Sequence, residues 1–304
     1  MEGQMSEDGS RIAKVLARAG VASRREAEVM IISGRVAVNG KRIDSPALNV
    51  TPRDRISVDG KPLAAAEPAR LWMYHKPLGL VTTTRDEQGR PTVFESLPDD
   101  MPRVMSVGRL DLNSEGLLLL TNDGDLKRRL ELPSTGWLRK YRVRVNGTPT
   151  DDMLAPLREG VRIEGERFQP MIVSIDRQQG ANAWLTIGIR EGKNREIRRA
   201  MDHVGLSVNR LIRVSYGPFQ LGQLAKGAVS EVKSRVLREQ LGEDSPKDAP
   251  LTKAAKPGPP RAKPKAKRPP APESTGRPPR APARPGQKAR TPRPAPSGGR
   301  KPTR

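Results

Sequence analysis

Cysteine is absent from the 304 residues of this chain, and histidine occurs only twice. We therefore expect no disulfides and no thiolate metal sites. A zinc or iron site would need carboxylates clustered around the histidines, and the sequence contains no such cluster, so we expect no metal. No apolar run approaches ~20 residues, and we expect no membrane-spanning helix. The first nine residues are polar and acidic, unlike a signal peptide, so the expected location is cytoplasmic.

Positive charge is in large excess. The chain has 56 Lys and Arg against 34 Asp and Glu, a formal net charge of +22. Such a balance favours a polyanionic partner, of which nucleic acid is the usual case.

The composition changes sharply at about Ser245. From there to the C-terminus the chain contains 17 prolines, no aromatic residue, and 17 Lys and Arg against two acidic residues, a net +15. A segment of this kind cannot bury enough apolar surface to fold, so we expect residues 245–304 to be a disordered tail. Basic tails bind RNA without sequence preference, through release of counterions.

Near the N-terminus the pattern predicts two helices and a hairpin. Ser10 is the expected cap of a first helix over residues 11–19, and S-R-R-E at Ser23 to Glu26 predicts a capping box for a second helix. In V-A-V-N-G-K-R-I, Asn39-Gly40 predicts a tight hairpin turn. The cations of this segment form a candidate RNA-binding face. They are Arg11, Lys14, Arg18, Arg24, Arg25 and Arg35. The alternative is that these charges only keep a small domain hydrated, as surface charges often do. The stretches R-I-A-K-V-L-A-R-A-G-V-A-S-R-R-E-A-E and G-R-V-A-V-N-G resemble the S4 RNA-binding domain over residues 10–58.

The most informative stretch runs from Val107 to Gly124, V-G-R-L-D-L-N-S-E-G-L-L-L-L-T-N-D-G. The four leucines predict a short strand that is buried on both faces. Asp111 would then lie in the loop at the mouth of a rigid core element, where a catalytic group is both fixed and reachable. An aspartate before Asn-Ser is also a common turn or cap residue, and this alternative stays open from the residues alone.

This stretch resembles the catalytic motif of the pseudouridine synthases of small- and large-subunit ribosomal RNA, the RsuA-like branch. Gly108, Asp111, Gly116 and Asp123-Gly124 all fall in register with G-R-L-D-x-x-S/T-x-G-L-L-L-x-T-x-D-G. The resemblance implies that Asp111 is the essential catalytic residue. H-K-P-x-G at His75 to Gly79 matches the first motif of the family, and the loop R-D-E-Q-G-R-P-T-V resembles the large-subunit members more than the small-subunit ones.

Two more elements carry the family match. Tyr141 lies in the alternating strand R-K-Y-R-V-R-V, where a tyrosine is most often a core residue, but the family places its base-stacking tyrosine here. The segment I-R-E-G-K-N-R-E-I-R-R-A-M implies that Arg198 is the active-site cation that pairs with Asp111, with Arg195 as second choice. Four cations on one helix can also be a solvated surface. The remaining candidate RNA-binding residues of the catalytic part are Lys76, Arg109, Lys193, Arg195 and Arg199.

The expected fold class is α+β, with a small S4 domain and a catalytic domain built on a mixed, mostly antiparallel sheet. Residues 80–84, L-V-T-T-T, predict a strand, and residues 228–241 a last helix. The expected domains, in chain order, are a disordered N-terminus at 1–9, the S4 domain at 10–58, a linker at 59–69, the catalytic domain at 70–244 and the tail at 245–304. The resemblance implies a monomer.

The implied reaction is isomerisation of a uridine in ribosomal RNA, with 23S RNA or an assembling subunit as partner. No atoms enter or leave and no electrons are transferred, so no cofactor is expected. One alternative is a non-catalytic ribosome assembly factor that only binds RNA. Another is a glycosidase with Asp111 and Glu115 as its carboxylate pair, which the aromatic content of 3% disfavours because sugar grooves are usually rich in aromatic residues.

Overall fold

The computed structural model describes residues 9–132 and 136–241. We expect residues 1–9 and 245–304 to be disordered. Apart from Gly9, these residues lie outside the described ranges. Within the described ranges, no helix is long and apolar enough to cross a bilayer.

The N-terminal part combines two helices with short strands packed around one small core. Ile12, Leu16, Ala27, Ile31 and Val36 are buried in that core. The strands form a four-stranded antiparallel sheet in the order β3-β2-β5-β6 and a separate pair, β1 with β4. The elements are β1 (Ser10–Arg11), α1 (Ile12–Arg18), α2 (Arg24–Ile32), β2 (Val36–Val38), β3 (Lys41–Arg42), β4 (Asn49–Val50), β5 (Ile56–Val58) and β6 (Lys61–Pro62).

The start of each helix tests the expected caps. The capping box of α2 is confirmed: Glu26 N donates to Ser23 Oγ at 3.1 Å, and Ser23 N donates to Glu26 Oε2 at 2.7 Å. The prediction that Ser10 caps α1 is wrong. Ser10 belongs to β1 and pairs with Val50 of β4, and the residue before the helix, Arg11, makes no side-chain capping bond. The hairpin turn is confirmed, with Asn39 and Gly40 both at positive φ, 51° and 81°.

The larger part is built on one nine-stranded sheet in the order β13-β14-β10-β15-β9-β7-β17, with β16 paired to β15 and β8 to β9. Only β15 and β9 pair in parallel, so the expected mixed, mostly antiparallel sheet is confirmed. The strands of this sheet are β7 (Leu71–Lys76), β8 (Met105–Val107), β9 (Glu115–Thr121), β10 (Arg139–Asn146), β13 (Ile172–Gln179), β14 (Asn182–Ile189), β15 (Ser207–Tyr216), β16 (Phe219–Gln220) and β17 (Val229–Glu231). A separate antiparallel hairpin consists of β11 (Arg162–Ile163) and β12 (Glu166–Arg167).

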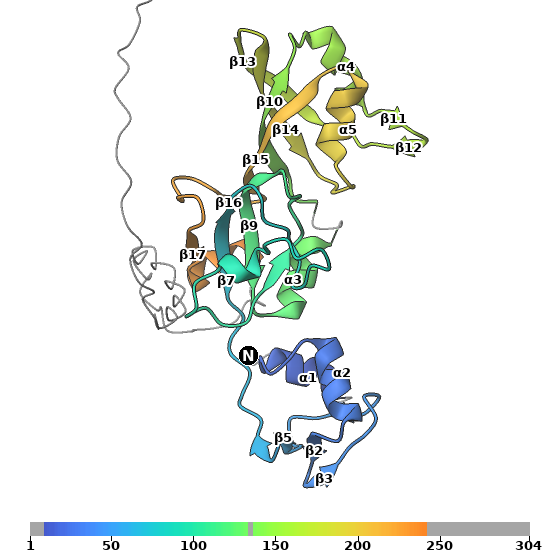
Figure 1. Cartoon of the computed structure of the whole chain (residues 1–304), viewed down its shortest axis with the longest axis vertical. Helices are drawn as coiled ribbons and strands as arrows, with labels where there is room; N and C mark the ends of the chain where they lie inside the picture. Colours follow the sequence, from blue (N-terminus) through green and yellow to red (C-terminus); the bar gives the residue numbers. More distant parts are fainter. Residues whose placement is uncertain (1–8, 133–135, 242–304) are drawn as a thin grey trace, which may run out of the picture. The chain divides into compact units, whose positions relative to one another are not determined.

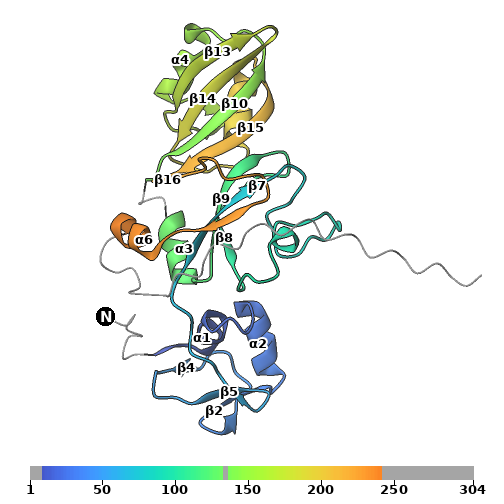
Figure 2. The ribbon, with the colours of Figure 1, turned by 90° about the vertical axis from the view of Figure 1, so that its left-hand side faces the viewer.

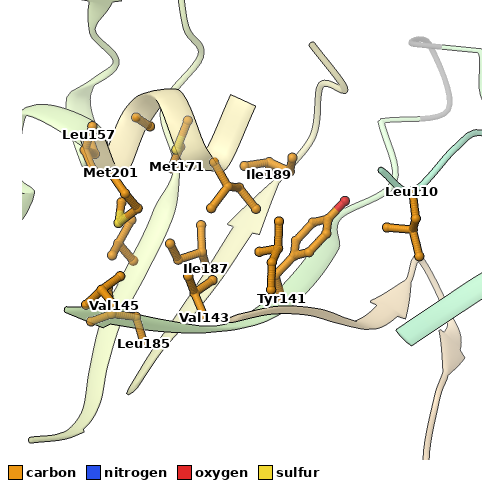
Figure 3. Packing of buried hydrophobic residues seen from close by; sticks show 14 of the residues in the cluster. Leu110, Tyr141, Val143, Val145, Leu157, Met171, Leu185, Ile187, Ile189 and Met201 are labelled. Carbon is orange, nitrogen blue, oxygen red and sulfur yellow. The ribbon is translucent and has the colours of Figure 1, made fainter. Parts of the chain in front are cut away.

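Helices cover one face of the half-sheet β13-β14-β10-β15 (Figure 1). Leu154 and Leu157 of α4, with Ile197 and Met201 of α5, are buried in the same core as the inward side chains of these strands. Figure 3 shows part of that packing, with Tyr141 at the end of the cluster nearest Leu110. The helices of this part are α3 (Gly124–Glu131), α4 (Asp151–Glu159), α5 (Glu196–His203), α6 (Ser234–Leu241) and the 3-10 turn η1 (Phe94–Ser96).

The leucine run forms the central strand β9, and all seven of its residues are buried. Leu118 and Leu120 face the core beneath α4 and α5, whereas Leu117 and Leu119 face a second core that includes Leu126 of α3. Because alternate side chains of a strand point to opposite faces, a strand between two cores must be apolar throughout. The predicted doubly buried strand is confirmed.

Two expected elements differ. Residues 80–84 form no strand, and Val81 makes only an isolated bridge with Thr92. Residues 228–241 split into the edge strand β17 and the helix α6, because the backbone of Val229–Glu231 pairs with β7 before the helix begins at Ser234. Pairing with a sheet edge overrides the helical pattern of this short segment.

Gly116 permits the only parallel pairing of the large sheet. Its φ is +107°, and a Cβ there would lie 2.3 Å from the Arg213 carbonyl oxygen of β15. We predict that Gly116→Ala lowers the free energy of unfolding by about 3 kcal/mol or more, from the strained φ and the clash together. Gly124→Ala is the matched control, because a Cβ there comes no nearer than 3.9 Å to Met105 Cε. Equal stability of the two variants in urea titration would contradict the prediction.

Candidate active site

Asp111 lies in a turn between β8 and β9, and the ammonium of Lys76 holds this turn. Lys76 Nζ donates to the carbonyl oxygens of Asp111 at 3.1 Å, Ser114 at 2.8 Å and Pro77 at 3.1 Å. An ammonium has three donors, so its hydrogen-bonding capacity is filled. Burial lowers the pKa of Lys76 to about 8, against the opposing effect of the Asp111 and Glu115 charges. The predicted RNA contact of Lys76 is therefore wrong: a fully buried ammonium occupied by backbone carbonyls cannot reach a phosphate.

The remaining carbonyls of the turn are also held. Gly79 N donates to the Leu112 oxygen at 3.0 Å, and Arg198 Nη2 donates to the Asn113 oxygen at 2.7 Å. Arg198 comes from α5, is buried, and also donates to the Val208 oxygen at 3.1 Å. Burial lowers the pKa of Arg198, as does the neighbouring Arg195, while the negative charge of Asp111 acts in the opposite direction. The guanidinium thus lies within electrostatic reach of Asp111 and bonds to the backbone of its turn.

Asp111 and Tyr141 line one pocket of about 1160 Å³. Tyr141 is buried in β10, and its ring forms part of the pocket wall. The predicted residues Arg109, Lys193 and Arg195 line the same pocket, together with Arg139. The lining also includes Glu131, Glu191 and Glu196, but its cations outnumber its carboxylates, so the wall around the half-buried Asp111 is basic on balance. In the described ranges, no group of three or more His, Asp or Glu side chains is placed to hold a metal ion.

The other predicted cations lie elsewhere. Arg199 points away from the pocket wall toward the β11–β12 hairpin, where it pairs with Glu166 at 2.7 Å and Glu164 at 3.1 Å. In the N-terminal part, Arg24 and Arg25 are exposed in the first turn of α2, whereas Arg35 is paired with Asp59. Arg11, Lys14 and Arg18 lie in or next to α1.

Arg213 is a pocket residue that the sequence reasoning missed. It faces the pocket from β15, opposite Tyr141, and is only 2% exposed. Its Nε donates to the Leu117 oxygen at 2.7 Å, and its Nη2 is buried without a partner among the described residues. A detectable signal existed: Arg213 occupies an inward position between Leu211 and Ser215 in an alternating strand, where an arginine is unusual.

A buried carboxyl group, Glu196, was also missed. It opens α5, lines the pocket and accepts a hydrogen bond from Lys193 N at 3.0 Å through Oε2, while Oε1 is buried without a partner among the described residues. Burial raises its pKa to about 7, and the neighbouring Glu191 adds to the increase. By contrast, Glu115 lies outside the pocket lining, fully buried, and is paired with Arg210 and Lys226. Glu115 is therefore no partner for Asp111, and the glycosidase alternative is wrong.

Known proteins match this chain along most of its described length. A family profile described as RNA pseudouridylate synthase matches residues 70–203, and one described as S4 domain matches residues 10–56. An uncharacterized RNA pseudouridine synthase of Rickettsia prowazekii is 45% identical over 231 residues, covering 76% of this chain and 97% of the relative. Ribosomal large subunit pseudouridine synthase B of Pseudomonas aeruginosa is 43% identical over 244 residues, covering 77% of this chain and 63% of the relative. A crystal structure of a pseudouridylate synthase superimposes with a TM-score of 0.54 at 24% identity, over 76% of this chain and 99% of that one, which supports the fold.

The ionisation of Glu196 predicts a pH dependence of stability. Between its ordinary pKa of 4.5 and its raised value of about 7, the unfolded chain ionises while the folded protein keeps the proton, so stability falls as pH rises through this window. We predict that Glu196→Gln is more stable than the wild type at pH 8 by roughly 1–3 kcal/mol and nearly equal to it at pH 5. The exposed Glu159→Gln is the control. Thermal unfolding at both pH values checks this, and a pH-independent difference would refute it.

Proposed function

Because this chain belongs to the RNA pseudouridylate synthases and carries an S4 domain, we propose that it isomerises a specific uridine of 23S ribosomal RNA, with Asp111 as the catalytic carboxylate. The observation that carries the proposal is the position of Asp111: a half-buried carboxylate in a basic pocket, in a turn whose carbonyls are held by Lys76 and Arg198. A large-subunit substrate is supported by the chain's similarity to the ribosomal large subunit pseudouridine synthase B of Pseudomonas aeruginosa.

The reaction makes limited demands on the protein. The N1–C1′ bond breaks, the base turns, and C5 bonds to C1′; the proton that leaves C5 balances the one gained at N1. In this proposal Asp111 acts as nucleophile on C1′ or on the base, or takes a proton from C2′. Tyr141 provides an aromatic surface for the extruded base, whose removal from its stack costs a few kcal/mol. Its hydroxyl is our candidate for accepting the C5 proton.

The polar edge of the base needs partners within the pocket. Ser114 Oγ, Arg213 Nη2 and Glu196 Oε1 are buried polar atoms without partners among the described residues, and all three side chains line the pocket. Buried polar atoms are normally hydrogen-bonded, so an unpaired group calls for an explanation. A uracil ring carries both donors and acceptors, and binding it would satisfy such atoms.

We further propose a division of labour along the chain. Residues 10–58 bind and select the RNA, and residues 59–69 link the domains after adding the short strand β6 to the S4 sheet. Residues 70–244 perform the chemistry, and the +15 segment 245–304 adds affinity without sequence preference. The protein acts as a monomer on ribosomal RNA or on the assembling subunit. A purely structural assembly factor would not require a held carboxylate and a buried tyrosine in one pocket, so we place that alternative second.

We predict that Asp111→Asn abolishes pseudouridine formation and leaves RNA affinity within a few-fold, because Asn keeps the size but not the charge of the carboxylate. The measurement is carbodiimide mapping of ribosomal RNA transcripts by reverse transcription, with RNA affinity measured in parallel. Asp100→Asn, in an exposed turn outside the pocket, is the control. Substantial turnover by Asp111→Asn would rule out the assignment.

We predict that the double variant Arg24→Glu/Arg25→Glu raises KM for ribosomal RNA and changes kcat little, because these exposed residues open α2, where phosphates dock at a helix N-terminus. Lys41→Glu/Arg42→Glu, exposed on β3, makes the same charge change elsewhere in the domain. If kcat collapses and KM stays constant, the S4 domain contributes to the active site instead of to substrate selection.

A further inference from the structure

The face of the half-sheet β13-β14-β10-β15 that is turned away from the pocket is open. Tyr141 and Leu211 point into the pocket and the core, so Arg142 and Arg210, their neighbours along the strands, point to the opposite face. Figure 2 looks onto these strands, and no helix of the described residues lies in front of them. We call this surface the open face; its residues are Lys140, Arg142, Arg144, Ser174, Asp176, Arg177, Trp184, Thr186 and Arg210.

Trp184 lies near the centre of the open face and is not a core residue. The other two tryptophans, Trp72 and Trp137, are packed in or against the apolar cores, whereas Trp184 is half-buried and belongs to none of them. The Arg142 guanidinium stacks over its ring at 4.9 Å. On the neighbouring strands Trp184 pairs in register with Arg144 and Arg177. The structure thus presents an indole with guanidinium groups around it on one face of the sheet.

The charge of the open face is strongly positive. Five cations point to it: Lys140, Arg142, Arg144, Arg177 and Arg210. Against them are only two carboxylates of the described residues. Asp176 lies 3.8 Å from Arg142, and it accepts from the Thr186 hydroxyl at 2.9 Å. Glu115 is fully buried at the edge of the face and is paired with Arg210 and Lys226.

The positive charge of the open face, together with the Trp184 ring, indicates which kind of molecule binds there. The basic segment 245–304 of the same chain has the same sign and is excluded as an occupant. An acidic protein would satisfy the cations but would not need an available ring. RNA supplies both complements, because phosphates pair with guanidinium groups and bases stack on aromatic side chains without regard to sequence.

We propose that the open face binds a second segment of the ribosomal RNA, with Trp184 stacking on an unpaired base and Arg142 and Arg144 holding the adjacent phosphates. The proposal goes beyond the proposed function and rests on it only in taking RNA as the ligand. The strands that place Tyr141 in the pocket also place Arg142 and Arg144 on the other side of the sheet. A long RNA that wraps around the sheet edge would contact both surfaces, whereas a short hairpin would reach only the pocket.

The first test is the triple variant Arg142→Thr/Arg144→Thr/Trp184→Thr in the full chain, since threonine keeps the strand propensity. We expect the Kd for a long ribosomal RNA transcript to rise by roughly 10- to 100-fold, with a shallower dependence on salt, and kcat to stay within about two-fold. Lys233→Thr/Arg235→Thr removes two exposed cations next to and within α6 and should change neither value. An unchanged Kd and salt slope for a folded triple variant overturns the proposal.

The second test uses the absence of cysteine, and it requires no change to the cations. A benzophenone attached at Ser174→Cys reports on the open face, and one at Asn194→Cys reports on the pocket. We expect both to crosslink to ribosomal RNA, at different nucleotides. Crosslinks from Asn194→Cys without any from Ser174→Cys overturn the second surface and leave the proposed function standing. Crosslinks from Ser174→Cys alone support the second surface and count against RNA in the pocket. Crosslinks from Ser174→Cys to ribosomal proteins only, in assembling subunits, also overturn the proposal.

Discussion

Two buried cations hold the backbone of the turn that carries Asp111, and the geometry of the pocket depends on them. Lys76 from β7 and Arg198 from α5 together bond to the carbonyls of Asp111, Asn113 and Ser114. Burying a cation is costly, and several hydrogen bonds per cation offset that cost. Hydrogen bonds to charged donors contribute about 1.5–3 kcal/mol each, roughly twice a neutral one. A turn held in this way fixes the backbone from which the Asp111 side chain projects, and the proposed catalysis depends on a positioned group.

The same cations show where sequence reasoning succeeds and fails. Asp111 and Tyr141 could be placed together because the family resemblance implies an active-site position for each, and the structure brings both to one pocket. Lys76 is the last residue of β7, and the apolar residues of that strand indicate only that the strand is buried. They do not show whether the Lys76 ammonium bonds to backbone carbonyls or is exposed to RNA. The alternating pattern around Arg213 could have marked it as an inward-facing arginine, but not which carbonyl it bonds to. Glu196 was missed because its raised pKa depends on burial and on the neighbouring Glu191, which the local pattern does not reveal.

The central strands of the fold were easier to predict than the short segments that flank them. The leucines of β9 predict a strand between two cores because no other short element buries four consecutive apolar side chains so completely. The segments that were predicted wrongly, residues 80–84 and 228–241, lie where tertiary pairing decides between weak local preferences. The charge pattern of β10, which alternates apolar and basic side chains, predicts a two-sided strand and in retrospect describes both surfaces of this half of the sheet.

The parallel contact between β15 and β9 has a mechanical consequence. Asp111 lies on the β9 side of this contact and Tyr141 on the β10 side, so the pocket spans the line along which the two halves of the sheet are joined. The paired register there is only two residues long, Ile212 with Glu115 and Arg213 with Gly116. It is the shortest pairing along the strand order β13-β14-β10-β15-β9-β7-β17, and the side chain of Arg213 adds a bond across it, from Nε to the Leu117 oxygen at 2.7 Å. The spacing between the Asp111 carboxylate and the Tyr141 ring is therefore set across the shortest pairing on that path, which Gly116 makes possible by its close approach to Arg213.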